Sequence, residues 1–440
     1  MTRYDLAYCA LAPLVAPVLL YRRLALGKYR ESFPSMFGKS WSKPQDPKWN
    51  DGCLWVHAVS VGECVAAKAL IRPLRDHVSA LPVLLTTVTE TGQALARQLV
   101  PEHADLATYY PADFSWVVKK FLSTFMPRLL VLMETELWPN VIEAAAANNM
   151  CVVVANGRIS EDSFRQYLRF RSLFHRPLKK IDAFCMQSEE DAERIIQIGA
   201  PKDRVHVTGN CKFDVPYACP SEARKEELRQ LLGIEPGMPV VVFGSTHPGE
   251  EEIVVRVTEN LRSRIPSLKV LLVPRHPERF EAVWKFLEES QIPSGRLSRS
   301  SEAPLGKDLA IVLIDKMGLL AELYALATVA VVAGSFVPGI GGHNLLEAAI
   351  HGIPVVYGPY MEKQPELTRI LSPQNGGIVA DRSTLSATLH ELLTNPERQR
   401  KHGDAVRHAA ISQQGAAVKT AEIIGDAFRR KSLSAKYEPR

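Results

Sequence analysis

Short apolar runs alternate with helical segments along most of the chain. In the first half these runs lie at 54–58, 83–88, 106–110, 129–133, 152–155, 183–186 and 205–207. Because the runs are apolar at every position and not at alternate positions, they predict strands that are covered on both faces. The helical segments between them favour parallel βαβ units, so residues 31–215 are predicted to form a Rossmann-like domain.

A second series of apolar runs follows at 240–243, 270–273, 310–314, 329–333, 354–357 and 377–379. Residues 214–222, with two prolines and no apolar period, suit a connection between domains. We therefore expect a second Rossmann-like domain over 216–430, with its last helix able to pack back on the first domain, and a polar tail over 431–440. Two such α/β domains facing each other would present the carboxyl ends of their strands to a shared cleft.

The chain begins with an apolar run over 6–21 that contains Pro13 and Pro17. Basic residues follow it: Arg22, Arg23, Lys28 and Arg30. This pattern favours a membrane anchor over the alternative of a buried helix, and we assign the anchor to residues 1–30. The run is shorter than the roughly 20 residues that cross a bilayer, so interfacial insertion competes with a true span. The basic flank predicts that both domains face the cytoplasm from the inner membrane.

The overall composition narrows the possible classes of protein. Of 440 residues, 46% are hydrophobic and 23% are charged, which is typical of a folded protein and excludes disorder or many membrane spans. The net charge of +5 is too small to predict a nucleic-acid partner but is compatible with an anionic membrane or a phosphorylated substrate. The seven cysteines contain no Cys-x-x-Cys pair and are interpreted as reduced thiols.

Two loops of the second domain are candidate phosphate sites. Residues 244–249 (GSTHPG) join a strand to a helix but lack the dinucleotide and Walker patterns. Ser245 and Thr246 could bind phosphate at the positive end of the helix dipole, or they could simply cap the helix. Arg275 ends the next strand, where a guanidinium can hold two phosphate oxygens.

The most specific stretch is 334–347 (GSFVPGIGGHNLLE). Its glycines, Gly342 among them, allow backbone to approach a ligand closely. Asn344 and Glu347 lie three residues apart at a predicted helix start, and the carboxylate of Glu347 can accept hydrogen bonds from both ribose hydroxyls. Upstream, the backbone of Met317 and Gly318 is placed to bind the edge of a base.

In the first domain, two carboxylates are predicted at the carboxyl edge of the sheet. Glu63 follows a strand and opens a helix, and Glu134 ends another strand two residues before Glu136. Carboxylates at that edge suit a general base or a group that orients substrate, although an acidic residue also favours a helix N-terminus for structural reasons alone. We find no cluster with metal-ligand spacing, so we expect metal-independent chemistry with no cofactor.

A basic segment in the first domain is interleaved with aromatic and aliphatic residues. Arg165, Arg169 and Arg171 alternate with Phe164, Leu168 and Phe170. A solvated helix face explains this pattern as well as contact with an anionic lipid does.

Together the motifs resemble those of the 3-deoxy-D-manno-octulosonic acid (Kdo) transferases of lipopolysaccharide synthesis. The resemblance rests on 57–63 (HAVSVGE), 133–140 (METELWPN), 156–160 (NGRIS), 208–214 (TGNCKFD), 244–247 (GSTH), 273–280 (VPRHPERF) and 341–347 (GGHNLLE), in the same order. It implies a GT-B fold, a CMP-Kdo donor, a lipid A precursor (lipid IVA) as acceptor and an inverting, metal-independent transfer.

The resemblance also implies residue roles. Glu63 would be the general base, Glu134 would orient the substrate or the base, and Lys212 would meet the sugar carboxylate. CMP would be held by the residues of the second domain: Ser245, Thr246, Arg275, Met317, Gly318, Gly342, Asn344 and Glu347. The residues alone leave two alternatives open, a GT-B transferase that uses a UDP-sugar and a lipid-linked acceptor, and a non-catalytic membrane-bound sugar-binding protein. An additional Gly339 before Gly341 departs from the family pattern.

Overall fold

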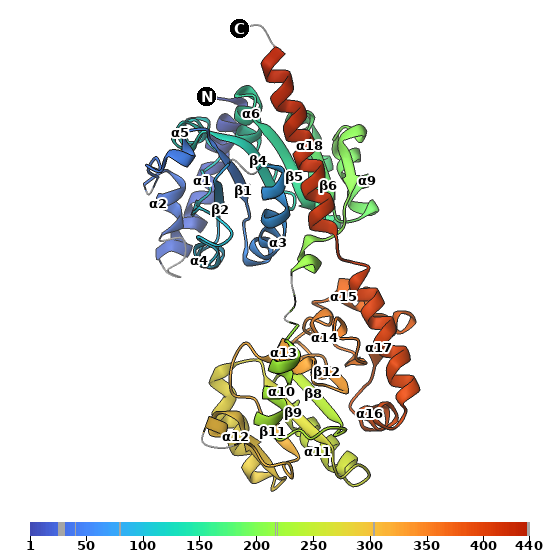
Figure 1. Ribbon diagram of the computed structural model, residues 1–440. Coiled ribbons are helices and arrows are strands. Elements are labelled where there is room, and N and C mark those ends of the chain that lie inside the picture. Colours follow the sequence, from blue (N-terminus) through green and yellow to red (C-terminus); the bar gives the residue numbers. More distant parts are fainter. Residues whose placement is uncertain are drawn as a thin grey trace. The chain divides into compact units, whose positions relative to one another are not determined.

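The computed structural model describes residues 1–24, 31–39, 41–78, 81–215, 217, 219–301 and 304–437. The chain forms two compact units, of which unit 1 comprises Met1–Val215 with Gln413–Arg440, and unit 2 comprises Pro216–Ser412 (Figure 1). The division after Val215 coincides with the boundary expected from the sequence. The chain returns to unit 1 at Gln413, however, so unit 2 ends earlier than the expected residue 430.

Unit 1 is built on a parallel sheet of seven strands in the order β3-β2-β1-β4-β5-β6-β7. The strands are β1 (Cys53–His57), β2 (Val83–Thr87), β3 (Leu106–Tyr109), β4 (Pro127–Met133), β5 (Cys151–Gly157), β6 (Ala183–Met186) and β7 (Val205–Val207). The strand order reverses between β1 and β4, which pair directly, with Val56 opposite Val131. In doubly wound sheets, ligands bind at the carboxyl ends of the strands beside such a reversal.

Helices cover both faces of this sheet. They are α1 (Arg3–Leu24), α2 (Ser32–Met36), α3 (Val61–His77), α4 (Glu90–Gln98), α5 (Ser115–Phe125), α6 (Pro139–Ala147), α7 (Glu161–Arg169), α8 (Arg171–Lys179), α9 (Glu189–Ile198) and α18 (Ala416–Tyr437). On β1, Leu54 and Val56 face a core shared with α3 and α18, whereas Trp55 faces a core shared with α5 and α6. Burial on both faces explains why the strands read as continuous apolar runs.

The last helix, α18, belongs to unit 1 although it follows unit 2 in sequence. It lies along β5 and β6 and packs against α3 (Figure 1). Ala417, Ala421 and Ile424 are buried in the same core as Leu54. The Asp214 carboxylate accepts backbone N–H bonds from Gly415 and Ala417, at 2.5 and 2.6 Å, and so binds the start of this helix. The expectation that the final helix could pack back on the first domain matches this arrangement.

Unit 2 repeats the architecture with a parallel sheet in the order β10-β11-β9-β8-β12-β13-β14. The strands are β8 (Val240–Thr246), β9 (Lys269–Pro274), β10 (Ser294–Arg296), β11 (Ile311–Leu313), β12 (Val329–Val332), β13 (Val355–Tyr357) and β14 (Ile378–Val379). The helices are α10 (Glu222–Leu231), α11 (Glu251–Arg262), α12 (Phe280–Glu289), α13 (Leu320–Tyr324), α14 (Leu346–Ala349), α15 (Pro365–Ile370), α16 (Leu385–Thr394) and α17 (Pro396–Ile411). The α/β fold with two parallel sheets is as predicted. Only β10 was not anticipated, because this short edge strand (SGR) has no apolar run.

The N-terminal segment was expected to be a membrane anchor that either spans the membrane or inserts at its interface, and the structure gives no support to the span. Residues Arg3–Leu24 form α1, and no helix among the described residues is long and apolar enough to cross a membrane. Asp5, in the first turn of α1, is fully buried and accepts bonds from the N–H and hydroxyl of Ser115 and from the amide of Asn140. The start of α1 is therefore a docked part of unit 1. The basic residues Lys28 and Arg30 lie outside the described residues.

Candidate functional site

A cavity of about 310 Å³ opens in unit 2 at the carboxyl ends of β8, β9 and β11. It is lined by Ser245, Val273, Pro274, Arg275, Lys316, Met317, Gly318, Leu320, Ala321, His343, Asn344 and Glu347. Six of the eight residues predicted to bind a nucleotide, from four separate loops, thus meet around one space. Each loop follows a strand, which is why residues far apart in the sequence converge here.

The carboxyl end of β8 is irregular at Gly244 and Ser245, where its register with β9 shifts. A side chain at Gly244 would place Cβ 2.0 Å from the hydroxyl of Tyr324, so only glycine fits there. Ser245 has a φ of 63°, a left-handed conformation that is uncommon for serine and that recurs at ligand sites. Ser245 lines the cavity.

Thr246 has a different environment from the one expected. It is fully buried, and its hydroxyl donates a 3.0 Å hydrogen bond to Glu251, which also accepts two bonds from Arg279 at 2.8 and 3.0 Å. Thr246 is not among the residues that line the cavity. Because its hydroxyl is buried and already bonded to a carboxylate, Thr246 is not available to a ligand. Its side chain instead stabilises the end of β8 through Glu251.

A buried glutamate also holds the glycine-rich loop after β12. Glu250 is 2% exposed and accepts backbone N–H bonds from Gly334 (2.8 Å), Phe336 (3.0 Å) and His247 (2.9 Å). Burial raises the pKa of Glu250, and the three N–H donors oppose the rise. This carboxylate fixes the loops after β8 and β12 to each other, and so fixes two walls of the cavity.

The glycine-rich loop then leads to Asn344 and Glu347 at the start of α14. Gly342 has a φ of 82°, and a Cβ there would lie 2.1 Å from the sulfur of Met361, so this close approach requires glycine. Gly342 itself does not line the cavity. Asn344 accepts a bond from the N–H of Leu346 through Oδ1, and its Nδ2 donates a 3.4 Å bond to the hydroxyl of Tyr217. Burial raises the pKa of Glu347, while Arg275 lowers it.

In unit 1, Glu63 stands in the first turn of α3. Its Oε2 accepts a bond from the N–H of Val59 at 2.8 Å, and Oε1 accepts one from the hydroxyl of Ser60 at 2.9 Å, while Ser60 caps the helix. Glu63 is 5% exposed, and burial raises its pKa, to which the charge of Glu134 adds. Ser60 and Glu63 thus form a variant of the capping box, in which Glu63 stabilises the start of α3. The carboxylate that was predicted to be a general base is therefore also the one that stabilises the helix N-terminus.

Glu134 and Lys212 form an ion pair beside Glu63. Glu134 follows β4 with a φ of 55°, and its Oε1 lies 2.8 Å from Nζ of Lys212. A Cβ at Gly62 would lie 3.6 Å from the same Nζ, so the lysine reaches the turn that carries Glu63. The nearby Glu136 has its pKa raised to about 7 by burial and by repulsion from Glu63 and Glu134. One ammonium and three carboxyl groups therefore meet beside the reversal of the sheet.

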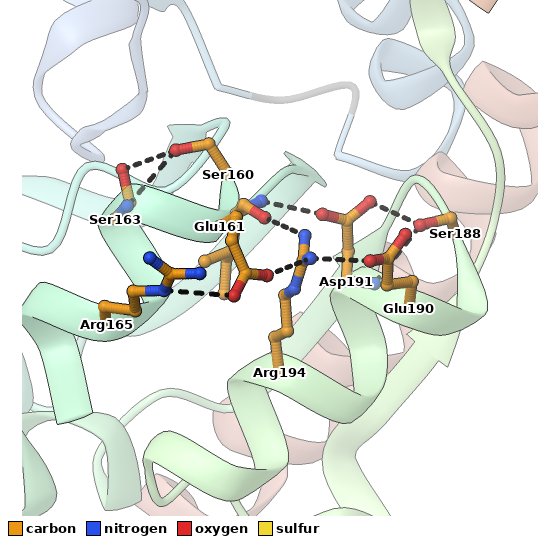
Figure 2. Close-up of polar contacts among 9 residues, drawn as sticks. Ser160, Glu161, Ser163, Arg165, Ser188, Glu190, Asp191 and Arg194 are labelled. Atoms are coloured by element: carbon orange, nitrogen blue, oxygen red, sulfur yellow. Dashed lines mark hydrogen bonds and ion pairs between the residues drawn. The ribbon is translucent and has the colours of Figure 1, made fainter.

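The basic segment forms α7 and α8, and α7 has no buried residue. Its start is fixed to α9 by the polar network in Figure 2, in which Arg194 binds Glu161, Glu190 and the carbonyl of Ile159. Asp191 accepts bonds from the N–H of Ile159 and the hydroxyl of Ser188 (Figure 2). The network holds the start of α7, and Phe164 and Tyr167 pack one side of the helix against the core of unit 1.

The predicted basic residues of this segment lie on an exposed surface. Arg165 pairs with Glu161 at 3.2 Å, and Arg169 lies over the ring of Phe170. Arg165, Arg169 and Arg171 are all exposed, as are the apolar side chains of Leu168, Phe170 and Leu173. Basic and large apolar side chains thus share one exposed surface of unit 1, here called the α7–α8 surface.

Two histidines at the cavity were not predicted as site residues. His343 lines the cavity, and its Nε2 lies 2.8 Å from Nε2 of His247. His343 stands within the Gly-Gly-His-Asn stretch, so its position was visible in the sequence, but its partner lies in a loop 96 residues earlier. Only the fold brings the two rings together.

Comparison with known proteins gives consistent results. A family model described as 3-deoxy-D-manno-octulosonic-acid transferase (kdotransferase) matches residues 31–215. A 3-deoxy-D-manno-octulosonic acid transferase of Bordetella pertussis is 33% identical over 432 residues, which cover 96% of this chain and 98% of that protein. A bifunctional glycosyltransferase/methyltransferase of Fusobacterium nucleatum is also 33% identical, over 80% of this chain, but the chain spans only 54% of that longer protein.

Among solved structures, a glycosyltransferase of Rickettsia africae is similar to this chain with a TM-score of 0.53. The two are 12% identical, and the match covers 88% of this chain and 100% of that one. At this identity the likeness concerns the fold alone.

Proposed function

The chain belongs to the Kdo transferase family, and on this premise we propose that it transfers Kdo from CMP-Kdo to a hydroxyl of a lipid A precursor such as lipid IVA, with Glu63 as general base. Membership of the family makes the protein a glycosyltransferase of lipopolysaccharide synthesis. The donor nucleotide, the acceptor, the residue roles and the GT-B arrangement are parts of the proposal.

The observation that carries the donor assignment is the cavity of unit 2. Its size suits a mononucleotide, and it combines two cationic side chains, Arg275 and Lys316, with the half-buried carboxylate of Glu347. We assign Arg275 and Ser245 to the phosphate and Glu347 to the ribose hydroxyls. The backbone at Met317 and Gly318 is assigned to the edge of the cytosine.

Three predicted donor residues remain, of which Thr246 is buried outside the cavity lining and receives no contact with the donor. The other two receive different roles. The amide of Asn344 lies at the cavity and is assigned to the donor, whereas Gly342 provides the tight turn that precedes it. Positive charge at the cavity supports a metal-independent transfer, because side chains are available to meet the charge that develops on the departing phosphate. When the bond between the anomeric carbon and the phosphate breaks, CMP leaves with the electron pair, and Arg275 is placed to stabilise it.

On the acceptor side, Glu63 removes the proton of the acceptor hydroxyl as its oxygen bonds to the anomeric carbon. The raised pKa of Glu63 suits this step, because a more basic carboxylate accepts a proton more readily. Glu63 belongs to unit 1 and the cavity to unit 2. Attack from the side opposite the phosphate inverts the anomeric configuration.

Lys212 and Glu134 are proposed to prepare the environment of Glu63. The ammonium lowers the pKa of Glu63 and the Glu134 carboxylate raises it, so together they adjust the basicity of the catalytic group. The Lys212 side chain is also long enough to move from Glu134 to the carboxylate of Kdo. Its ion pair with Glu134 would then be replaced by an ion pair with the sugar. The 2.8 Å contact is only partly buried, so the exchange costs little.

The α7–α8 surface is proposed to meet the lipid acceptor at the inner-membrane surface. Its arginines match the phosphates of a lipid A precursor, and its exposed apolar residues match acyl chains. Interfacial contact of this kind needs no membrane-spanning helix. Substituting Arg169 and Arg171 by glutamine should raise the KM for the lipid acceptor and leave the affinity for the nucleotide unchanged.

A transfer assay with purified full-length protein tests the proposal. Labelled Kdo should pass from CMP-Kdo to lipid IVA, and calorimetry should detect binding of CMP but not UDP. Binding of UDP in preference to CMP would favour the alternative of a UDP-sugar transferase. Binding of CMP-Kdo without transfer to any lipid A precursor would contradict the acceptor assignment.

A further inference from the structure

Two histidine side chains form a direct hydrogen bond at one wall of the cavity. Nε2 of His247 lies 2.8 Å from Nε2 of His343, and the rings are nearly parallel, 12° apart. His247 is 7% exposed, and His343 lines the cavity. The close approach depends on Gly334, where a Cβ would lie 2.7 Å from the His343 ring. The pair is therefore built into the junction of the loops after β8 and β12.

This geometry limits how many protons the pair can carry. A neutral imidazole has one N–H donor and one acceptor nitrogen, and a protonated imidazole has two donors. An Nε2···Nε2 contact of 2.8 Å needs one donor and one acceptor. The pair can thus be neutral, with the two rings in opposite tautomers, or it can hold a single additional proton. Two additional protons would bring two N–H groups face to face and break the bond.

The surroundings of the pair are mainly cationic. The ring of His276 packs edge-on against His247 at 5.3 Å. Burial, together with the charges of His247 and Arg275, lowers the pKa of His343 to about 4. Burial likewise lowers the pKa of His247, together with His276, Arg279 and Arg275. Lys363, from the loop after β13, acts on both rings in the same direction.

Anionic groups near the pair are already engaged. Glu250 accepts three backbone N–H bonds, one of them from His247, and Glu251 is bound to Arg279 and Thr246. Across the cavity, Glu347 interacts electrostatically with Arg275. A ligand phosphate would be a new negative charge close to the pair, and it would favour the state with one additional proton.

We propose that His247 and His343 act as a one-proton unit that takes up a proton when an anionic phosphodiester binds in the cavity and releases it when the ligand leaves. This inference rests on the donor site proposed above and deepens it. The hydrogen bond survives protonation, so one ring gains a second N–H without any rearrangement of the loops. The additional positive charge then adds to that of Arg275 and Lys316 while the donor is bound.

Proton-coupled binding makes affinity depend on pH in a defined direction. Because the liganded state binds more protons, affinity weakens as pH rises, by up to about tenfold per pH unit when a whole proton is taken up. Cytidine 5′-methyl phosphate is a suitable probe, since a phosphodiester does not titrate near neutral pH. Any proton taken up on binding then belongs to the protein.

Calorimetric titration of the full chain, in two non-phosphate buffers with different heats of ionisation, measures this uptake. We expect the wild type to take up a measurable fraction of one proton, and H343Q and H247Q each to bind the diester with almost no uptake. H390Q, which changes a histidine on α16 outside the cavity lining, should behave as the wild type. Thermal unfolding of each variant verifies that unit 2 remains folded. Binding by the wild type without proton uptake, or uptake that persists in both variants, would overturn the proposal.

Failure of the donor-site proposal would look different. If the diester does not bind at all, the assignment of the cavity to CMP falls. Nitrogen NMR of the histidine rings, with and without inorganic sulfate, then tests the histidine pair. Sulfate is suitable because it also does not titrate near neutral pH. Opposite tautomers without sulfate and protonation of one ring with sulfate support the pair as proposed, whereas identical tautomers or no response to sulfate contradict it.

Discussion

Two arginines four residues apart in the loop after β9 offer a sharp test of the cavity, because the structure gives them opposite roles. Arg275 lines the cavity, and its side chain is exposed. Arg279 makes a two-pronged ion pair with Glu251, which is 4% exposed. We predict that R275Q weakens nucleotide binding without destabilising unit 2, and that R279Q destabilises unit 2.

The expected magnitudes follow from burial. A charge-assisted contact contributes about 1.5–3 kcal/mol, and because Arg275 is exposed we expect the lower half of that range, about 10–30-fold in Kd. Removing the partner of a buried carboxylate costs about 3–5 kcal/mol. Thr246 still donates to Glu251 in R279Q, so we expect about 3 kcal/mol, which lowers the Tm of a unit of this size by about 6–12 °C.

The assays are calorimetric titration with CMP and thermal unfolding followed by circular dichroism. R275Q should bind CMP more weakly and unfold at the temperature of the wild type. R279Q should unfold at a lower temperature and, below its transition, bind CMP with an affinity close to the wild type. If R275Q bound CMP as tightly as the wild type, the phosphate would not lie at this wall of the cavity, and the donor assignment would have to be revised.

Further predictions concern the ribose, the ion pair and the first helix. E347Q should bind CMP about 30-fold more weakly, and the difference in affinity between CMP and its 2′-deoxy form, measured by calorimetry, should disappear in the variant. Lys212 lowers the pKa of Glu63 and Glu134 raises it, so the acidic limb of the kcat/KM profile should move to higher pH in K212Q and to lower pH in E134Q. Burial opposes ionisation of Asp5, but its hydrogen bonds outweigh this effect and lower its pKa in the folded protein. The ionised carboxylate therefore stabilises unit 1 above about pH 4, and this stabilisation is lost as the pH falls through the pKa of Asp5 in the folded protein. D5N should therefore destabilise unit 1 by about 2 kcal/mol in denaturant titrations near neutral pH, with a smaller difference in acid.

The pattern of apolar runs was sufficient to predict two parallel sheets, because strands buried on both faces leave a continuous signal. The edge strand β10 has no such signal, since Ser294–Arg296 contains no apolar side chain. The docking of α1 was only the less favoured of two interpretations of the apolar run. A single buried aspartate that satisfies Ser115 and Asn140 cannot be inferred from a run that otherwise reads as a membrane anchor.

The candidate site was predictable where a residue ends a strand. Arg275 directly follows β9 and Met317 follows β11, and parallel topology brings such positions to one edge. Side-chain orientation was not predictable. Thr246 and Ser245 are neighbours in sequence, yet the left-handed φ at Ser245 directs them to different environments. The contact of His343 with a ring 96 residues away depends on tertiary structure and leaves no local pattern.

The central claim is that Glu63 is the base of a Kdo transfer, and the rate of a single turnover tests it most directly. Transfer of labelled Kdo from CMP-Kdo to lipid IVA would be followed with enzyme in excess for the wild type, E63Q and a control, E90Q, which changes an exposed glutamate in the first turn of α4. We predict that E63Q slows transfer about 10²–10⁴-fold with an unchanged affinity for CMP, and that E90Q matches the wild type. Transfer by folded E63Q at the rate of the wild type would contradict the assignment.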